Sequence, residues 1–333
     1  MPSGKIGQSL TALEIFDLVR EDLAQAEREI GLESIACVDA ITYIGQYIQS
    51  GGGKRLRPIL VLLCGRLFGE SNPGLIRMAA VVEMIHTATL VHDDVIDMAK
   101  TRRGRPSINV VWGNHTSVLA GDWLYMQAFQ AALRERSFPI LDLLIDLTQR
   151  MVEGELIQLE RLGRIAVTEA DYMELIDRKT ASLFSACARL GALTQNAAES
   201  AEARLGEYAW NLGIAFQLID DILDFTSREK ILGKPVGNDL REGKVTLPLI
   251  YALEKASPED RKLVETVLAD GSYDQVPFGK ILQLLHRHEA IERAQRRAQT
   301  FTEKARQIIA GFPDSPYQRA LLAVTDLVTG RDH

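Results

Sequence analysis

Residues 216–225 read Phe-Gln-Leu-Ile-Asp-Asp-Ile-Leu-Asp-Phe, so three aspartates stand among large apolar side chains. Residues 92–97, His-Asp-Asp-Val-Ile-Asp, repeat the Asp-Asp-x-x-Asp spacing at the end of another apolar segment. Residues four apart in a helix lie one turn apart on the same face. The two stretches therefore predict two helices, each with carboxylates gathered on one face.

Acidic residues on a helix more often form a solvated face than a binding site. Here the carboxylates adjoin apolar residues, where like charges are costly unless a cation compensates them. Carboxylates are hard oxygen ligands suited to Mg²⁺, which commonly shares its coordination with water and substrate phosphates. We therefore predict that both clusters bind Mg²⁺ together with a diphosphate, and the ligand set comprises Asp93, Asp94, Asp97, Asp220, Asp221 and Asp224.

The rest of the 333-residue chain carries helical periodicity and few strand signals. Short turns separate the helical segments, no long linker interrupts them, and no fixed-period repeat is present. We predict an all-α fold with a single large helical domain spanning residues 1–333. The expected helices cover 10–30, 35–49, 55–69, 74–98, 115–133, 139–161, 169–190, 199–226, 244–255, 258–269, 278–285, 288–310 and 315–329.

Charge and cysteine content exclude several classes of protein. The net charge of −7 argues against a broad nucleic-acid surface. Cys37, Cys64 and Cys187 form no Cys-x-x-Cys pair, which favours a reducing cytoplasm over a disulfide framework. No uninterrupted apolar stretch is long enough to cross a bilayer, so we expect no membrane-spanning segment. The most apolar region, 75–90, is broken by Arg77, Glu83 and His86.

Basic residues follow flexible turns at three places. Residues 51–58, Gly-Gly-Gly-Lys-Arg-Leu-Arg-Pro, form a glycine-rich turn at the start of a helix, where backbone and cations can approach an anion. The spacing differs from a P-loop. Arg102-Arg103-Gly104 follows the first aspartate cluster, and arginine forks suit phosphate. The segment 233–248 follows the second cluster with glycines and lysines suited to a phosphate lid.

Together these motifs resemble the trans-prenyl diphosphate synthase family, in family order and over nearly the whole chain. The resemblance covers Gly-Gly-Gly-Lys-Arg-x-Arg-Pro, Asp-Asp-x-x-Asp followed by Arg-Arg-Gly, Phe-Gln-x-x-Asp-Asp-x-x-Asp, and Gly-Lys-x-x-Gly-x-Asp-Leu leading to Gly-Lys-x-Thr-Leu-Pro. It implies an all-helical bundle of the isoprenoid synthase type with a central substrate cavity. It also implies a homodimer.

The family's functional residues are carried over position by position. The resemblance implies that Asp93, Asp97 and Asp220 are the principal magnesium ligands, and that the remaining motif aspartates bind further ions or act through water. It implies three Mg²⁺ ions with substrate bound. The diphosphate of isopentenyl diphosphate would contact Lys54, Arg57, His86 and Arg103, and the allylic diphosphate would contact Arg102, Lys179, Thr180, Gln217, Lys234 and Lys244.

The implied reaction is head-to-tail (1′-4) condensation of isopentenyl diphosphate with an allylic prenyl diphosphate. The catalytic set would be Asp93, Asp97, Asp220, Arg102, Lys179 and Lys234. A terpene cyclase is disfavoured, because both aspartate clusters and the Gly-Gly-Gly-Lys-Arg segment are intact. A non-catalytic partner subunit typically loses aspartates, and a di-iron bundle needs Glu-x-x-His pairs.

Product length depends on the residues just before Asp93. Ala88 stands five residues upstream, where short-chain members of the family usually carry a bulky aromatic residue. This favours a medium- or long-chain, octaprenyl-type product of the kind used as a quinone side chain. A farnesyl or geranylgeranyl diphosphate product is the alternative. We expect Trp123 or Met126, on the helix from Ser117 to Phe129, to set the tunnel floor.

Overall fold

The computed structural model describes residues 10–35, 38–226 and 236–329. Within these ranges the chain is almost entirely helical, and its strands are β1 (Thr101–Arg102) and β2 (Arg105–Pro106), which pair as a small antiparallel hairpin. The predicted all-α class is confirmed. The chain forms two compact units. Unit 1 comprises Met1–Thr148, Phe184–Ala209 and Gln307–Asp326, and unit 2 comprises Gln149–Leu183, Trp210–Arg306 and Leu327–His333.

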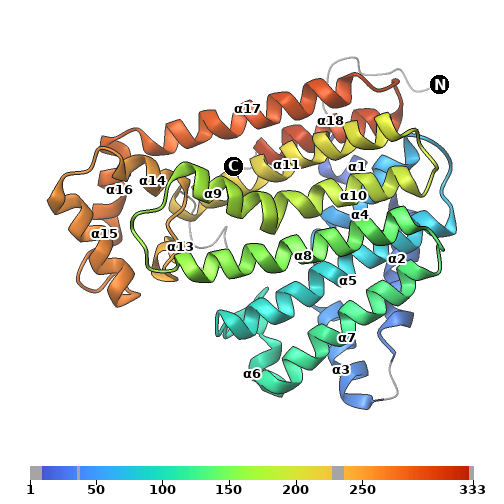
Figure 1. Ribbon diagram of the computed structural model, residues 1–333, viewed down its shortest axis with the longest axis horizontal. Helices are drawn as coiled ribbons and strands as arrows, with labels where there is room; N and C mark the ends of the chain where they lie inside the picture. Colours follow the sequence, from blue (N-terminus) through green and yellow to red (C-terminus); the bar gives the residue numbers. More distant parts are fainter. Residues whose placement is uncertain (1–9, 36–37, 227–235, 330–333) are drawn as a thin grey trace. The chain divides into compact units, whose positions relative to one another are not determined.

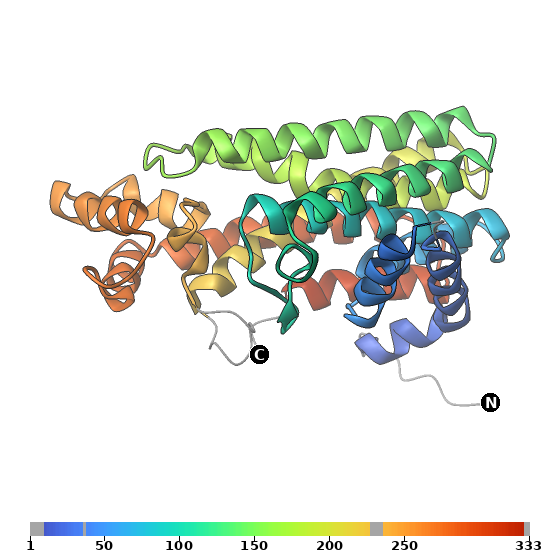
Figure 2. The ribbon, with the colours of Figure 1, turned by 90° about the horizontal axis from the view of Figure 1, so that it is seen from below.

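Unit 1 is built on helices from the first half of the chain (Figure 1). Among them, α5 packs along α2, α4 and α7, and the α5–α7 pair is also seen from below in Figure 2. The helices that lie wholly in unit 1 are α1 (Ala12–Leu18), α2 (Arg20–Glu33), α3 (Asp39–Ser50), α4 (Leu56–Arg66), α5 (Pro73–Ile96), α6 (Ile108–Trp112) and α7 (Asn114–Leu133).

The helix α5 is the core helix of unit 1. It begins at Asn72, whose side chain accepts a 2.9 Å hydrogen bond from the Leu75 backbone, and Pro73 fills the first position, where no N–H is needed. By length and composition it could cross a membrane, but 72% of its most apolar window is buried. This burial is that of a core helix in a soluble protein.

Unit 2 contains shorter helices, and α15 packs beside α16 at one end of Figure 1. The elements wholly in unit 2 are α9 (Glu169–Ile176), the π-helical turn η1 (Asp177–Ala181), α13 (Asn238–Arg241), α14 (Leu247–Leu253), α15 (Pro258–Asp270) and α16 (Phe278–Arg287). The remaining helices have residues in both units. They are α8 (Phe138–Arg161), α10 (Ser182–Leu193), α11 (Glu199–Thr226), α17 (Ala290–Ala310) and α18 (Pro316–Thr329).

The structure differs from the predicted helices at five places. The predicted helix 10–30 divides at Val19 into α1 and α2, and the predicted helix 169–190 is interrupted by η1. Periodicity missed the short α6 and α13 and the hairpin β1–β2, because elements of two to five residues are too short to show a repeating apolar face.

Candidate active site

The first aspartate cluster lies at the C-terminal end of α5, in unit 1. Asp94 is buried, Asp93 is half-buried and Asp97 is exposed. The Asp94 carboxylate accepts a 2.7 Å hydrogen bond from Arg102 Nε, because the hairpin brings Arg102 back to α5. Burial raises the pKa of Asp94, and the charge of Arg102 opposes that shift. The three carboxylates are thus in different environments, and Asp94 is already engaged by a cation of the chain.

The packing of α7 fixes this end of α5. A Cβ atom at Gly121 would lie only 2.2 Å from Nε2 of His92, so any larger residue there would require the His92 ring to move. The His92 imidazole also stacks on Tyr125 with ring centroids 5.9 Å apart. These contacts hold the helix end that carries Asp93 against α7.

The cations predicted to hold isopentenyl diphosphate gather in unit 1. Burial lowers the pKa of His86, and the positive charges of Arg57, Arg103 and Arg102 lower it further. Arg57 is half-buried with an enclosed Nε, and its guanidinium lies over the Phe184 ring at 5.6 Å. A neutral imidazole beside three guanidinium groups forms a positive region that suits a diphosphate.

The glycine-rich turn before α4 is held by an arginine that sequence reasoning left unassigned. Arg55 forms ion pairs with Glu27 at 2.9 Å and with the buried Glu83 at 2.7 Å. Burial by itself would lower the pKa of Arg55, but the ion pairs with Glu83 and Glu27 outweigh burial, so the pKa is raised. Lys54 is exposed beside it, and Arg103 donates to the carbonyl of the middle glycine. The sequence feature that indicates these ion pairs is Glu83, a single glutamate within the apolar helix α5.

The second aspartate cluster lies at the end of α11, in unit 2. Asp221 is buried, and its two oxygens accept hydrogen bonds from Tyr172 Oη at 2.6 Å and Gln217 Nε2 at 2.7 Å. Burial raises the pKa of Asp221 well above its ordinary value, and the nearby charges of Asp239 and Asp220 add to the shift. Carboxylates crowded in this way are the setting in which a divalent cation is favourable.

Asp224, the third member of this cluster, is used differently. It is fully buried, and its carboxylate accepts backbone hydrogen bonds from Asn238 at 3.3 Å and Asp239 at 3.1 Å, at the start of α13. Asp220 is half-buried. Within the described ranges no three Asp, Glu, His or Cys side chains form a complete metal cage. The donor set fits an ion that completes its coordination with phosphate and water.

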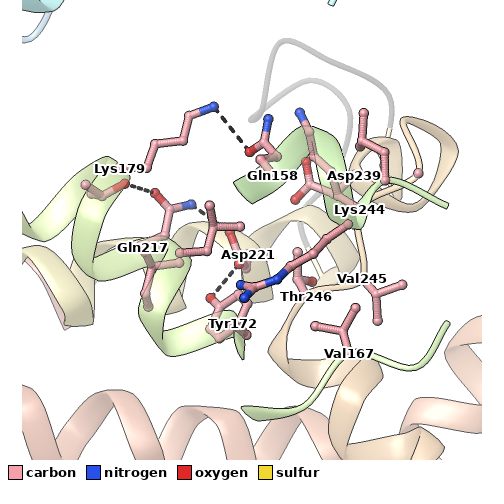
Figure 3. Close-up of a pocket in the computed structure, with 16 residues that line it drawn as sticks. Gln158, Val167, Tyr172, Lys179, Gln217, Asp221, Asp239, Lys244, Val245 and Thr246 are labelled. Atoms are coloured by element: carbon pink, nitrogen blue, oxygen red, sulfur yellow. Dashed lines mark hydrogen bonds between the residues drawn. The ribbon is translucent and has the colours of Figure 1, made fainter. Parts of the chain in front are cut away.

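A cavity of about 190 Å³ opens beside the second cluster, within unit 2 (Figure 3). Thr180 lies in it and donates to Gln217 at 2.9 Å, and Lys179 reaches Gln158 at 3.2 Å and also pairs with Glu155. The lining comprises Gln158, Arg161, Leu162, Val167, Tyr172, Leu175, Ile176, Lys179, Thr180, Gln217, Asp221, Asp239, Gly243, Lys244, Val245 and Thr246. Four of the residues predicted for the allylic diphosphate are thus brought together: Lys179, Thr180, Gln217 and Lys244.

The predicted lid segment is described only in part. Lys234 lies outside the described residues, and the segment from 236 onward contains α13. Lys244 Nζ pairs with Glu242 at 2.7 Å. The buried Thr246 hydroxyl has no hydrogen-bond partner among the described residues, and it lines the cavity. Lid closure stays a prediction.

Ala88, the predicted chain-length residue, is fully buried in an apolar cluster of unit 1. Trp123 packs against this cluster, whereas Met126 is 62% exposed and lines a surface groove. Of the two expected floor residues, only Trp123 therefore packs against the cluster that contains Ala88. The other members of the cluster are Ile44, Val91, Ile108, Ala120 and Leu124.

Comparison with known proteins gives consistent matches. The family model described as polyprenyl synthetase matches residues 38–285. Octaprenyl diphosphate synthase of Escherichia coli is 36% identical over 96% of this chain and 98% of its own length. A short chain isoprenyl diphosphate synthase of Methanothermobacter thermautotrophicus is 35% identical over 96% and 100%. The crystal structure of a Caulobacter crescentus polyprenyl synthase with calcium and isoprenyl diphosphate has a TM-score of 0.91, with 34% identity over 97% of this chain and 98% of that one.

Proposed function

Because this chain belongs to the polyprenyl synthetase family, we propose that it condenses isopentenyl diphosphate head-to-tail (1′-4) with an allylic prenyl diphosphate, giving an all-trans polyprenyl diphosphate of medium or long chain. The observation that carries the proposal is that each aspartate cluster is accompanied by phosphate-binding groups. His86 and three arginines lie near the first, and Lys179, Thr180 and Gln217 lie near the second.

The proposal includes magnesium, with three ions bound when substrate is present. Asp93, Asp97 and Asp220 would be the principal ligands. Asp94, Asp221 and Asp224, which accept hydrogen bonds from the chain, would bind further ions or act through water. When bound, the ions would neutralise the negative charge that develops on the departing diphosphate. The calcium in the related Caulobacter structure supports a divalent ion beside a diphosphate.

The chain's own residues would bind and orient the two substrates. Lys54, Arg57, His86 and Arg103 would hold isopentenyl diphosphate, with His86 as a neutral hydrogen-bonding group rather than a further charge. Arg102, Lys179, Thr180, Gln217, Lys234 and Lys244 would hold the allylic diphosphate. Its carbon–oxygen bond breaks, the isopentenyl double bond attacks the allylic cation, and the released diphosphate accepts the proton that is lost. No protein base is required.

The proposal treats residues 1–333 as one functional domain, because the family model spans residues of both units. It places the enzyme in the cytoplasm as a homodimer. The buried free thiols of Cys64 and Cys187 support a reducing compartment, and Cys37 lies outside the described residues. On α7, three apolar residues at seven-residue spacing, Leu119, Met126 and Leu133, are exposed by 65%, 62% and 45%. Such a stripe supports pairing with a second copy.

The direct test is elongation by the purified protein. We would incubate it with Mg²⁺, radiolabelled isopentenyl diphosphate and farnesyl diphosphate, and separate the products by chain length. The expected product is longer than geranylgeranyl diphosphate. Products that stop at that length would select the short-chain alternative, and no elongation would reject the enzyme.

Light scattering of the protein and of a Leu119→Glu variant tests the dimer, which the variant should weaken.

A further inference from the structure

The backbone that carries Lys179 and Thr180 departs from α-helical geometry. These two residues lie in η1, the π-helical turn between α9 and α10. Turns of this kind are rare and are frequent at functional sites. The turn reads Asp-Arg-Lys-Thr-Ala, without Gly or Pro. No residue of the turn favours the irregular backbone by itself, so contacts with neighbouring helices must hold it.

The carboxylate of Asp177, the first residue of η1, accepts hydrogen bonds from residues of α11 and α8 that belong to unit 2. Trp210 Nε1 on α11 donates to its Oδ1 at 2.6 Å, and Arg150 on α8 donates to its Oδ2 at 2.7 Å. The Trp210 ring packs edge-on against Phe301 with centroids 5.9 Å apart, which fixes the direction of its N–H. Both oxygens of Asp177 are therefore engaged, and the Trp210 donor is held in direction by Phe301.

The turn also lies tightly against α8. A Cβ atom at Gly154 would be 3.1 Å from Arg178 Cβ and 3.2 Å from the Lys179 nitrogen, so the helix and the turn are in close contact. Lys179 reaches Glu155 and Gln158 on the same helix. A shift of η1 would therefore displace the Lys179 ammonium directly.

The same turn supports the second aspartate cluster. Thr180 donates to Gln217, and Gln217 donates to Asp221, so the position of η1 is transmitted to the motif by two successive hydrogen bonds (Figure 3). Asp177 itself does not line the cavity. It lies on the same turn as Lys179 and Thr180, which do line the cavity.

We propose that Asp177 is a positioning residue for the allylic substrate. Its carboxylate, held by Arg150 and Trp210, fixes η1 so that Lys179 and Thr180 line the cavity together, where a diphosphate could contact both. This rests on the proposed function for the identity of the substrate. These contacts of Asp177 should affect binding of the allylic diphosphate. Binding of isopentenyl diphosphate should be unchanged, because no residue assigned to it lies on η1.

The test compares Asp177→Asn and Trp210→Phe with the unchanged enzyme. Asparagine keeps the size of the side chain but has only one oxygen and no charge, so it cannot accept from Trp210 and Arg150 through separate oxygens. We expect the KM for farnesyl diphosphate to rise about tenfold in Asp177→Asn, about 1.4 kcal/mol of binding free energy, and the KM for isopentenyl diphosphate to stay within about twofold. Because both residues act through one contact, the double variant should lose no more than Asp177→Asn alone.

Arg178→Gln is the matched control. Arg178 lies on the same turn but pairs with Glu153 and Glu174, and it does not line the cavity. It should change neither KM. If Asp177→Asn raised both KM values equally, or only lowered the melting temperature, Asp177 would be a general structural residue and the proposal would be wrong.

Calorimetric titration with farnesyl diphosphate and Mg²⁺ separates this proposal from the proposed function. An unchanged protein that binds farnesyl diphosphate but does not elongate it would contradict the proposed function. Weaker binding by Asp177→Asn would still support the positioning role of Asp177. Equal binding by Asp177→Asn and the unchanged protein would reject the positioning role of Asp177 even if elongation occurs.

Discussion

Tyr172 donates a 2.6 Å hydrogen bond to the buried carboxylate of Asp221, from a position 49 residues earlier in the chain. Both residues are almost fully enclosed, and burial together with the Asp221 charge raises the pKa of Tyr172 well above its ordinary value. The phenol is therefore a permanent donor that fixes the orientation of one carboxylate in the second aspartate cluster.

Replacing Tyr172 by Phe removes that donor while keeping the ring. We expect the rate of elongation to fall about tenfold, about 1.4 kcal/mol in activation free energy, and the Mg²⁺ concentration for half-maximal rate to rise, since Asp221 would be less well oriented. Steady-state rates across a Mg²⁺ series measure both effects. Tyr251→Phe also loses a tyrosine–carboxylate bond, to Glu169, and should leave both values unchanged.

Asp93→Ala should abolish most of the turnover with little loss of fold. The expected loss is about 10²–10³-fold, the size of the effect when one group that stabilises transition-state charge is removed. Asp93 is only half-buried, so its removal leaves no large cavity. Single-turnover rates and thermal unfolding measure the two effects. Asp142→Ala, at an exposed position on α8, is the control, and normal turnover in Asp93→Ala would refute the metal assignment.

Ala88→Phe should shorten the product. The larger side chain would enter the apolar cluster against which Trp123 packs and cost about 1–3 kcal/mol through overpacking. Chromatography of the labelled products measures the change. Met126→Phe, on the exposed side of α7, should leave the distribution as it is. An unaltered distribution in Ala88→Phe would exclude this route for the growing chain.

The pH dependence of stability should report the environment of His86. Its pKa is well below 6.5 in the folded protein, mainly through burial. The unfolded state therefore binds the proton more readily, and the free energy of unfolding should fall as the pH drops below about 6.5. Melting temperatures between pH 5 and 7.5 should decline less steeply in His86→Gln. His115→Gln, at an exposed position, should retain the full slope.

Much of the fold and part of the site could be predicted from local patterns. The helices follow from apolar periodicity, and the aspartate clusters from their spacing within apolar context. The spacing does not reveal which carboxylate is buried, because Asp94, Asp221 and Asp224 are selected by partners elsewhere in the chain: Arg102, Tyr172 and the start of α13.

Other features had no local signal. Tyr172 is one of eight tyrosines, and nothing near it in the sequence indicates that its partner is Asp221. The π-helical turn depends on contacts of Asp177 with Arg150 and Trp210, which are distant in the sequence. Met126 lies on the expected helix but on its outer face, and helical spacing alone does not fix the rotation of a helix about its axis.

Several cations that we propose to bind substrate already have carboxylate partners within the protein: Arg102 pairs with Asp94, Lys179 with Glu155 and Lys244 with Glu242. A diphosphate that arrives alone must take a cation away from its carboxylate, and a metal ion that arrives alone must compete with the resident cation. When both arrive, the metal can replace Arg102 at Asp94 while Arg102 pairs with the diphosphate, so neither of these charges is left unpaired. Metal and diphosphate should therefore bind cooperatively, each increasing the affinity for the other by the same factor. Simple anions such as inorganic phosphate should gain little from these cations in the absence of metal.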